Sequence, residues 1–424
     1  MTTDVQAVLA TLDNGVRVVV IPLPHLATAS VSVFVRCGSQ HESRRQNGIS
    51  HVIEHMAFKG TRTRTCQQIN LDAERLGADV NAHTDKDHTA FHMRGNARDA
   101  AAFVGMLGDI VRNGIFPEDE LARERDVLLQ EYTENEDDPM STAFRLFDQA
   151  CYGTHPAAQP VIGSRANIGR FVPADLAAFV GARHTGANIV VGVAGSVAAE
   201  RIVAAARAAF EDMPRGEENR IAAPVFVGGV RARRVPGDHV HVVLGFPIPA
   251  ANEPHETFRV AAALFGEGMS SPLLDELRER RGLVYHADCS TDIRDAYGQF
   301  IIEASTMPQR LAEICAEIER MLLRQAERVA AVDFERARNQ LAVRALFSHE
   351  APEARLELAA LDLFALGYIR SRDERLAAIA AVDAGQVRAA FAQLLARGAA
   401  IGMAGRYSKA ALDDVGRLAS RRAA

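Results

Sequence analysis

The sequence predicts an α+β fold made of two homologous domains, and three observations support this prediction. Two segments recur at nearly one offset, both halves of the chain begin with alternating strand patterns, and long amphipathic helices follow in each half. At about 150 residues per domain, a chain of 424 residues also indicates two or three domains.

The repeats indicate an internal duplication. Val191–Gly195 (VGVAG) recurs as Ile401–Gly405 (IGMAG), an offset of 401 − 191 = 210. The helical stretch Arg123–Glu131 (RERDVLLQE) matches Arg336–Arg344 (RARNQLAVR) at an offset of 336 − 123 = 213. Two matches at nearly the same offset favour duplication over chance.

A polar stretch separates the two copies. Met213–Pro224 (MPRGEENRIAAP) contains Pro214, Gly216 and Pro224 and keeps neither helical nor strand periodicity, so we interpret it as a linker. We therefore predict an N-terminal domain over residues 1–213, a linker over 214–224 and a C-terminal homologous domain over 225–424.

The elements follow in order along the chain. A turn at Leu12–Gly15 precedes a strand, and alternating apolar residues predict further strands at Ser30–Arg36 and His239–Phe246. Gly77–Gly95 is typical of a hairpin. Helical periodicity covers two segments, Asp99–Ile115 and Glu118–Tyr132.

Composition excludes several classes of protein. The net charge of −6 provides no broad basic surface for nucleic acid or anionic lipid, and no apolar run is long enough to cross a bilayer. Five scattered cysteines without a CxxC pair indicate reduced thiols. The first residues show neither a signal nor a transit peptide, so we expect a bacterial cytoplasmic protein without nucleic-acid or membrane partners.

The segment Gly48–Gly60 (GISHVIEHMAFKG) carries the most specific chemical pattern. Its apolar residues form one helical stripe, and His51, Glu54 and His55 lie on the opposite side. His51 and His55 are one turn apart, so both imidazoles can reach one metal ion while Glu54 points into the same space. Two imidazoles and a carboxylate suit Zn²⁺, and a catalytic zinc site needs one more protein ligand.

A carboxylate on another helix is the expected third ligand, and we assign it to Glu131. Glu131 lies at the end of the predicted helix Glu118–Tyr132, and Glu124 lies two turns earlier on the same face. The alternative is that this Glu-rich helix is simply solvated.

His51, Glu54 and His55, followed by Glu131 at 131 − 55 = 76 positions later, resemble the pitrilysin family of inverted-motif zinc peptidases. The resemblance implies that His51, His55 and Glu131 bind zinc, that Glu54 is the catalytic base, and that Glu124 supports the site. At the 213 offset, Glu131 falls on Arg344 and Glu124 on Ala337, so the second copy cannot rebuild the site and we expect one Zn²⁺ per chain.

The second half contains a further match to this family. Gly266–Ala287 resembles the C-terminal signature of the family, which implies that Arg278 and Tyr285 are catalytic residues that contact substrate at the zinc. A guanidinium and a phenol suit a carbonyl that becomes an oxyanion. Without the resemblance, Arg278 is interpreted as a solvated surface charge.

The resemblance also implies an architecture and a way to bind substrate. Each domain is expected to be a sheet with helices packed on one face, and the domains are expected to face each other around a chamber. The segment Asn81, Ala82, His83 and Thr84 matches an edge strand that pairs with the substrate peptide.

Three weaker candidates are present. Two histidine groups contain potential metal ligands, although solvated or hydrogen-bonded strand histidines are commoner: His83, His88 and His92 in the hairpin, and His239 and His241 in a strand. The acidic run Glu134–Pro139 either selects basic substrate residues or is a solvated helix end.

The sequence therefore predicts a zinc-dependent endopeptidase that hydrolyses peptides or unfolded segments, with Glu54 as general base on a zinc-bound water. The alternatives are a non-catalytic peptide-binding or scaffolding subunit and a metal-binding protein without hydrolytic action. Single-chain relatives are about twice as long in the family, so the resemblance implies a homodimer, or a heterodimer with a related subunit.

Overall fold

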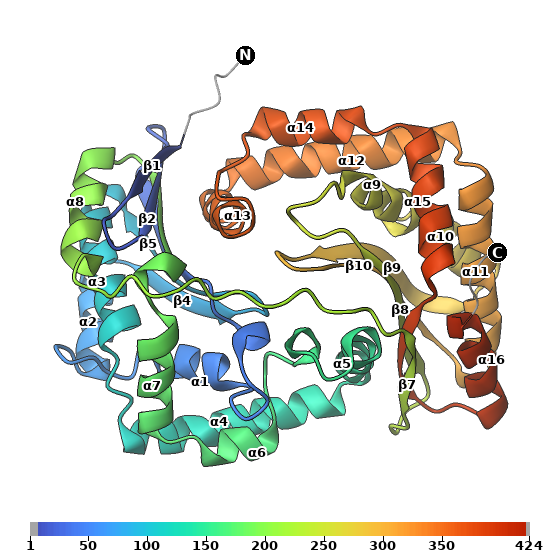
Figure 1. Ribbon diagram of the computed structural model, residues 1–424, viewed down its shortest axis with the longest axis horizontal. Coiled ribbons are helices and arrows are strands. Elements are labelled where there is room, and N and C mark those ends of the chain that lie inside the picture. The colour runs from blue at the N-terminus through green and yellow to red at the C-terminus, as the bar shows by residue number, and fades with distance from the viewer. Residues whose placement is uncertain (1–6, 421–424) are drawn as a thin grey trace. The chain divides into compact units, whose positions relative to one another are not determined.

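Two mixed sheets organise the chain. The computed structural model describes residues 7–420, in which a six-stranded sheet has the order β1-β2-β6-β3-β5-β4 and a five-stranded sheet the order β7-β11-β8-β10-β9 (Figure 1). The first unit contains the six-stranded sheet and comprises residues 1–132, 159–221 and 347–371. The second unit contains the five-stranded sheet and comprises residues 133–158, 222–346 and 372–424.

The first sheet is built from apolar, mostly β-branched segments. Its strands are β1 (Val8–Thr11), β2 (Arg17–Pro22), β3 (Thr28–Val35), β4 (Asp79–Thr84), β5 (Thr89–Asn96) and β6 (Ile189–Gly195). The predicted turn at Leu12–Gly15 joins β1 to β2, and Gly15 adopts the positive φ of 93° that this turn requires. The predicted hairpin is β4 and β5, and β4 forms the edge of the sheet.

Helices cover both faces of the first sheet. Its unit contains α1 (Ile49–Met56), α2 (Cys66–Arg75), α3 (Ala100–Asn113), the first part of α4 (Glu118–Asp137), α6 (Arg165–Arg170), α7 (Pro173–Arg183), α8 (Ala199–Phe210) and α13 (Pro352–Ala365). Figure 1 shows α3 and α8 on one side of the sheet and α13 on the other. On the α13 side, Leu356 and Leu363 form a buried cluster with Phe34 and Val190.

The second sheet repeats this plan. Its strands are β7 (Gly229–Arg233), β8 (Val240–Ile248), β9 (Val284–Ile293), β10 (Gly298–Thr306) and β11 (Ala400–Gly405). Its helices are α5 (Pro139–Tyr152), α9 (Glu256–Gly266), α10 (Pro272–Leu274), α11 (Leu311–Glu327), most of α12 (Ala331–Glu350), α14 (Arg372–Ala381), α15 (Ala384–Arg397) and α16 (Lys409–Ser420). Matching β2, β6, β3, β5 and β4 to β7, β11, β8, β10 and β9 reproduces the strand order, so the predicted α+β fold with two similar domains is confirmed.

Each half of the chain gives one helix to the sheet of the other half. Helix α13 packs on the first sheet and α5 belongs to the second unit, at equivalent positions separated by 352 − 139 = 213 residues. The packing units therefore differ from the contiguous ranges 1–213 and 225–424 around these two helices, and residues 214–221 of the predicted linker belong to the first unit. The helices expected on one face of each sheet are present. The exchanged helix covers the other face, because its apolar side is buried when it packs against the sheet there.

This exchange explains the glycine in the repeated motif. A Cβ atom at Gly402 would lie 2.1 Å from the carbonyl oxygen of Ala143 on α5, and a Cβ atom at Gly192 would lie 3.0 Å from Leu356 on α13. VGVAG and IGMAG thus place glycine where a helix crosses the strand closely.

The remaining sequence expectations concern the linker, the thiols and membrane spans. Residues 214–224 hold neither helix nor strand. All five cysteines are free thiols, as predicted. Within residues 7–420, no helix has both the length and the apolar composition needed to cross a bilayer.

Candidate metal centre

The histidine helix α1 begins at a fixed point in the first unit. The buried carboxylate of Glu42 accepts hydrogen bonds from the backbone N–H groups of Gly48 (2.7 Å) and Ser50 (2.8 Å), which compensates unpaired donors at the helix start. The predicted apolar stripe is buried: Ile49, Val52, Ile53 and Met56. Since the stripe packs inward, the polar side of α1 is oriented by the core behind it.

Three predicted zinc ligands lie together on α1 and α4. The Nε2 atom of His51 lies 3.7 Å and the Nε2 atom of His55 lies 3.6 Å from Oε2 of Glu131. The three side chains present donor atoms within 4.8 Å of one another. Zinc bonds of about 2.0–2.2 Å allow two donors to be up to about 4.2 Å apart. The two measured separations therefore fit one shared ion, and two imidazoles with one carboxylate are a zinc-type donor set.

A second carboxylate orients His55. Oε2 of Glu124 lies 3.1 Å from Nδ1 of His55, and Oε1 of Glu124 pairs with Nζ of Lys59 at 2.6 Å. The Nδ1 proton of His55 then donates to Glu124, which leaves the lone pair of Nε2 directed toward Glu131. Glu124 is only 13% exposed, so its charge is compensated by Lys59 and His55 rather than by bulk water.

Burial tunes the protonation of two groups in this centre. The pKa of His51 is lowered to about 4, first by burial and then by the neighbouring His55, so the imidazole is neutral and able to coordinate a metal. Burial raises the pKa of Glu54, the nearby charge of Glu131 adds to this rise, and the hydrogen bond from Thr84 opposes it. Oε2 of Glu54 accepts that hydrogen bond from Oγ1 of Thr84 at 2.8 Å.

The predicted substrate strand lies beside this centre. Asn81, Ala82, His83 and Thr84 belong to β4, and among the described residues only β5 pairs with β4. Thr84 connects this edge strand to Glu54 through the hydrogen bond described above. The role of the strand in binding peptides stays a prediction.

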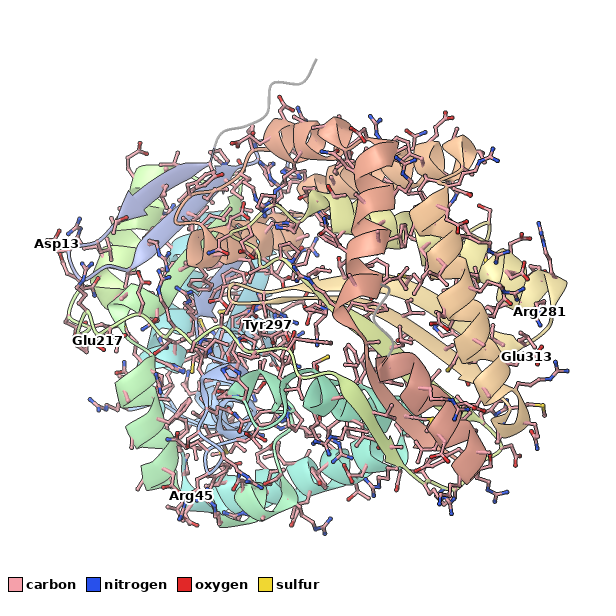
Figure 2. The ribbon with its side chains drawn as sticks, turned by 45° about the vertical axis from the view of Figure 1, so that its right-hand side comes forward. Asp13, Arg45, Glu217, Arg281, Tyr297 and Glu313 are labelled. Atoms are coloured by element: carbon pink, nitrogen blue, oxygen red, sulfur yellow. The ribbon has the colours of Figure 1, made fainter. Side chains whose placement is uncertain are left out.

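Arg278 and Tyr285 belong to the second unit. Arg278 lies in the short π-helix Asp275–Arg280 with a side chain 42% exposed, and Tyr285 on β9 is 83% exposed. Figure 2 labels the neighbouring Arg281 and Glu313 of α11, which form an ion pair at 2.7 Å. Arg281 also pairs with the buried Glu317 on the same helix, and these contacts anchor the segment. The predicted action of Arg278 and Tyr285 on a substrate stays a prediction.

The weaker histidine candidates differ in whether they lie close to other potential metal ligands. His83 and His88 form a second group of potential ligands with Glu357, a residue that sequence spacing does not reveal because it lies 357 − 88 = 269 positions further along the chain. A third group, Asp85, Asp87 and His88, shares His88 with it. Among residues 7–420, the groups of potential metal ligands do not include His92, His239 or His241.

The acidic run has structural partners in the second unit. Glu136 pairs with Arg145 and Arg233, both at 2.6 Å, and Asp138 caps α5 by accepting hydrogen bonds from Met140 and Ser141. These contacts match the helix-end interpretation of Glu134–Pro139.

Comparison with known proteins agrees with this geometry. The family model described as Insulinase (Peptidase family M16) matches residues 17–165, and the model Peptidase M16 inactive domain matches residues 170–341. An uncharacterized zinc protease of Rickettsia felis is 30% identical over 81% of this chain and 84% of its own length. One of Mycobacterium leprae is 33% identical over 74% of this chain and 72% of its own.

The fold is shared with solved structures. A protease from Helicobacter pylori superimposes with a TM-score of 0.86 at 20% identity, covering 95% of this chain and 99% of that structure. A chain of Complex III2 from Candida albicans gives a TM-score of 0.84 at 17% identity over 97% of both chains.

Proposed function

The chain belongs to peptidase family M16, the pitrilysin family, and we propose that it is a zinc-dependent endopeptidase acting on peptides or unfolded segments. One observation carries the proposal: α1 and α4 bring His51, His55 and Glu131 around one point, with Glu54 on the same side of α1. All four residues lie within the part that matches the Insulinase model.

His51, His55 and Glu131 would hold the ion. Zn²⁺, when bound, supplies a Lewis acid that activates water and polarises a peptide carbonyl. Glu124 fixes the ring of His55 through Nδ1, so that Nε2 is the nitrogen offered to the metal. A buried neutral His51 needs no proton release before it coordinates.

Glu54 acts as the general base in this proposal. Its carboxylate takes a proton from the attacking water and later gives that proton to the leaving amine. Burial raises its pKa, which brings the group closer to the working pH and makes it a better proton acceptor. The hydrogen bond from Thr84 holds Oε2, which leaves Oε1 as the oxygen for proton transfer.

The edge strand β4 suits an extended substrate. A peptide that pairs with the outer side of β4 would be held by backbone hydrogen bonds, which select unfolded chains more than particular side chains. Thr84 would then place the base directly beside the strand that binds substrate. Arg278 and Tyr285 are proposed to contact the substrate carbonyl, since their cationic and phenolic groups suit an oxyanion.

A non-catalytic subunit is the second candidate, because one matching family model carries the description inactive domain. That model covers residues 170–341, whereas His51, Glu54, His55, Glu124 and Glu131 all lie in the range of the first model. We therefore attribute the inactive character to the second half alone.

Metal analysis and peptide hydrolysis test the proposal. The purified chain should contain zinc and cleave a fluorogenic peptide, and a chelator should abolish cleavage until Zn²⁺ is restored. Glu54→Gln should retain the zinc of wild type but lose about 10²–10⁴-fold in kcat. Glu118→Gln, at the exposed start of α4, is the matched control and should keep full activity. Undiminished turnover by Glu54→Gln would exclude Glu54 as the base.

We propose that the active form is a dimer, either of this chain or with a related subunit, as the family resemblance implies. Light scattering on the purified chain should give twice the monomer mass of 45.9 kDa if the chain pairs with itself. A monomer that hydrolyses peptides at full rate would contradict a requirement for a partner.

A further inference from the structure

A second set of metal-type donors lies on the opposite face of the first sheet from the zinc centre. Thr84 on β4 donates to Glu54 on α1. Its neighbour His83 points to the other side of the strand, where Nε2 lies 3.9 Å from Oε1 of Glu357 on α13. Nε2 of His88 lies 3.7 Å from the same carboxylate oxygen. All these residues belong to the first unit.

The three donors have the spacing of one coordination sphere. Nε2 of His83 and Nε2 of His88 are 3.3 Å apart, so the three separations are 3.3, 3.7 and 3.9 Å. All three are below the limit of about 4.2 Å that bonds of about 2.0–2.2 Å allow. Two imidazole nitrogens and one carboxylate oxygen repeat the donor set of the first centre and suit Zn²⁺ and similar divalent transition metals.

The groups behind these donors orient both rings. Nδ1 of the buried His88 lies 2.7 Å from Oδ1 of Asp87, so in the neutral ring Nδ1–H donates to the carboxylate and Nε2 keeps its lone pair. Nδ1 of His83 lies 3.1 Å from Nε2 of His92, whose Nδ1 lies 2.8 Å from Oγ of Ser32. In one consistent set of tautomers, His83 donates to His92 and His92 donates to Ser32, which leaves Nε2 of His83 free of its proton.

We propose that His83, His88 and Glu357 form a second site for a divalent transition-metal ion, Zn²⁺ foremost, which fastens α13 to the β4–β5 hairpin. The site joins residues 83 and 88 to residue 357, so the ion cross-links the exchanged helix of the second half to the sheet of the first. A bound ion stabilises the arrangement that forms its site. The chain then binds two ions, one more than its sequence indicates, and the second has a structural role.

The test isolates the second site in the full-length chain. Glu131→Gln removes a ligand of the first centre without touching the second, and metal-free protein of this variant is titrated with Co²⁺ and Zn²⁺. We expect one equivalent to bind, with the visible absorption of Co²⁺ held by imidazole nitrogen. Adding Glu357→Gln should weaken binding by at least about 100-fold, and Asp87→Asn should weaken it by about 10–100-fold.

Glu353→Gln is the matched control for Glu357→Gln. Glu353 lies one turn earlier on α13 with the same side-chain exposure of 43%, and its carboxylate accepts from Ser30 and lies 3.5 Å from Arg94 rather than beside His83 or His88. Added to Glu131→Gln, it should leave one equivalent bound. Hydrogen exchange in α13 should slow on addition of Zn²⁺ to the Glu131→Gln protein and not to Glu131→Gln/Glu357→Gln. Absence of metal binding by Glu131→Gln would overturn the second site, and so would binding that Glu357→Gln does not weaken. The cluster of histidines would then be explained by their hydrogen bonds alone.

Discussion

Helices α4 and α12 are the same element in two copies, and only one of them carries the metal chemistry. Both helices are 20 residues long, and they start 331 − 118 = 213 positions apart. The buried Leu128 of α4 corresponds to the buried Leu341 of α12, whereas Glu124 and Glu131 correspond to Ala337 and Arg344. The two helices share the buried leucine that packs into the core, and they differ at the two positions that contribute carboxylates to the metal centre.

The second copy uses its substituted residues for packing and pairing. Ala337 is fully buried, and Arg344 forms an ion pair with Glu267. At the offset of 210, His51 and His55 of α1 fall on Ala261 and Phe265 of α9, so the second copy has neither imidazoles nor carboxylates at the equivalent positions. The fold therefore tolerates either set of residues, and the two halves differ in metal-binding capacity through a few side chains on α1 and α4.

The largest loss of activity is expected when Glu131 in the first copy is replaced by arginine, the residue at the equivalent position of the second copy. Glu131→Arg removes a ligand and places a cation at the metal position, so the ion of the first centre should be lost and peptide hydrolysis should fall at least about 10⁴-fold. Circular dichroism should be unchanged, because Glu131 is 45% exposed and α12 already carries arginine at this position. Retained hydrolysis would show that the ion is held elsewhere.

Acid should destabilise the first unit through its buried histidines. Burial lowers the pKa of His184 to about 4, and a backbone contact to Val111 only partly opposes this. The unfolded state binds the His184 proton more readily than the folded state. The stabilising contribution of the neutral His184 to the free energy of unfolding is therefore fully present above about pH 6.5, and it is lost as the pH falls toward 4, by about 3 kcal/mol at most. Metal-free protein measured by denaturant unfolding at pH 7 and 4.5 checks this, with hydrogen exchange separating the units. Equal acid sensitivity in both units would contradict it.

Removing the carboxylate behind His55 should have a smaller effect. Glu124→Gln keeps a hydrogen-bonding group near His55 and Lys59 but loses the charge, so zinc affinity of the first centre should fall by about 10–100-fold. Competition with a chelator of known affinity measures the change. An unchanged affinity would show that Glu124 acts only as a packing partner.

The smallest effect is expected in the reverse exchange. Arg344→Glu gives α12 the carboxylate of α4, yet the metal content should not rise because α9 offers no histidines. The change breaks a partly exposed ion pair with Glu267, so the free energy of unfolding should fall by about 1 kcal/mol or less. Thermal unfolding and elemental analysis provide the two readouts, and an additional equivalent of zinc would contradict this comparison.

The sequence predicted the parts of the structure that depend on local spacing. One helical turn joins His51 to His55, two turns join Glu124 to Glu131, and the repeated motifs marked the duplication. The exchange of α5 and α13 was not predicted, because an amphipathic helix does not specify which of two similar sheets it covers. Glu42, the bond between Thr84 and Glu54, and Glu357 were also missed, since they are brought into place by tertiary packing of distant segments.

The most direct test of the central claim is anomalous diffraction at the zinc edge from crystals of the zinc-loaded chain. We expect a peak about 2.0–2.2 Å from Nε2 of His51, Nε2 of His55 and a carboxylate oxygen of Glu131, with no peak beside Ala337 and Arg344. A zinc-loaded, hydrolytically active chain without a peak among these three ligands would show that they do not hold the catalytic ion.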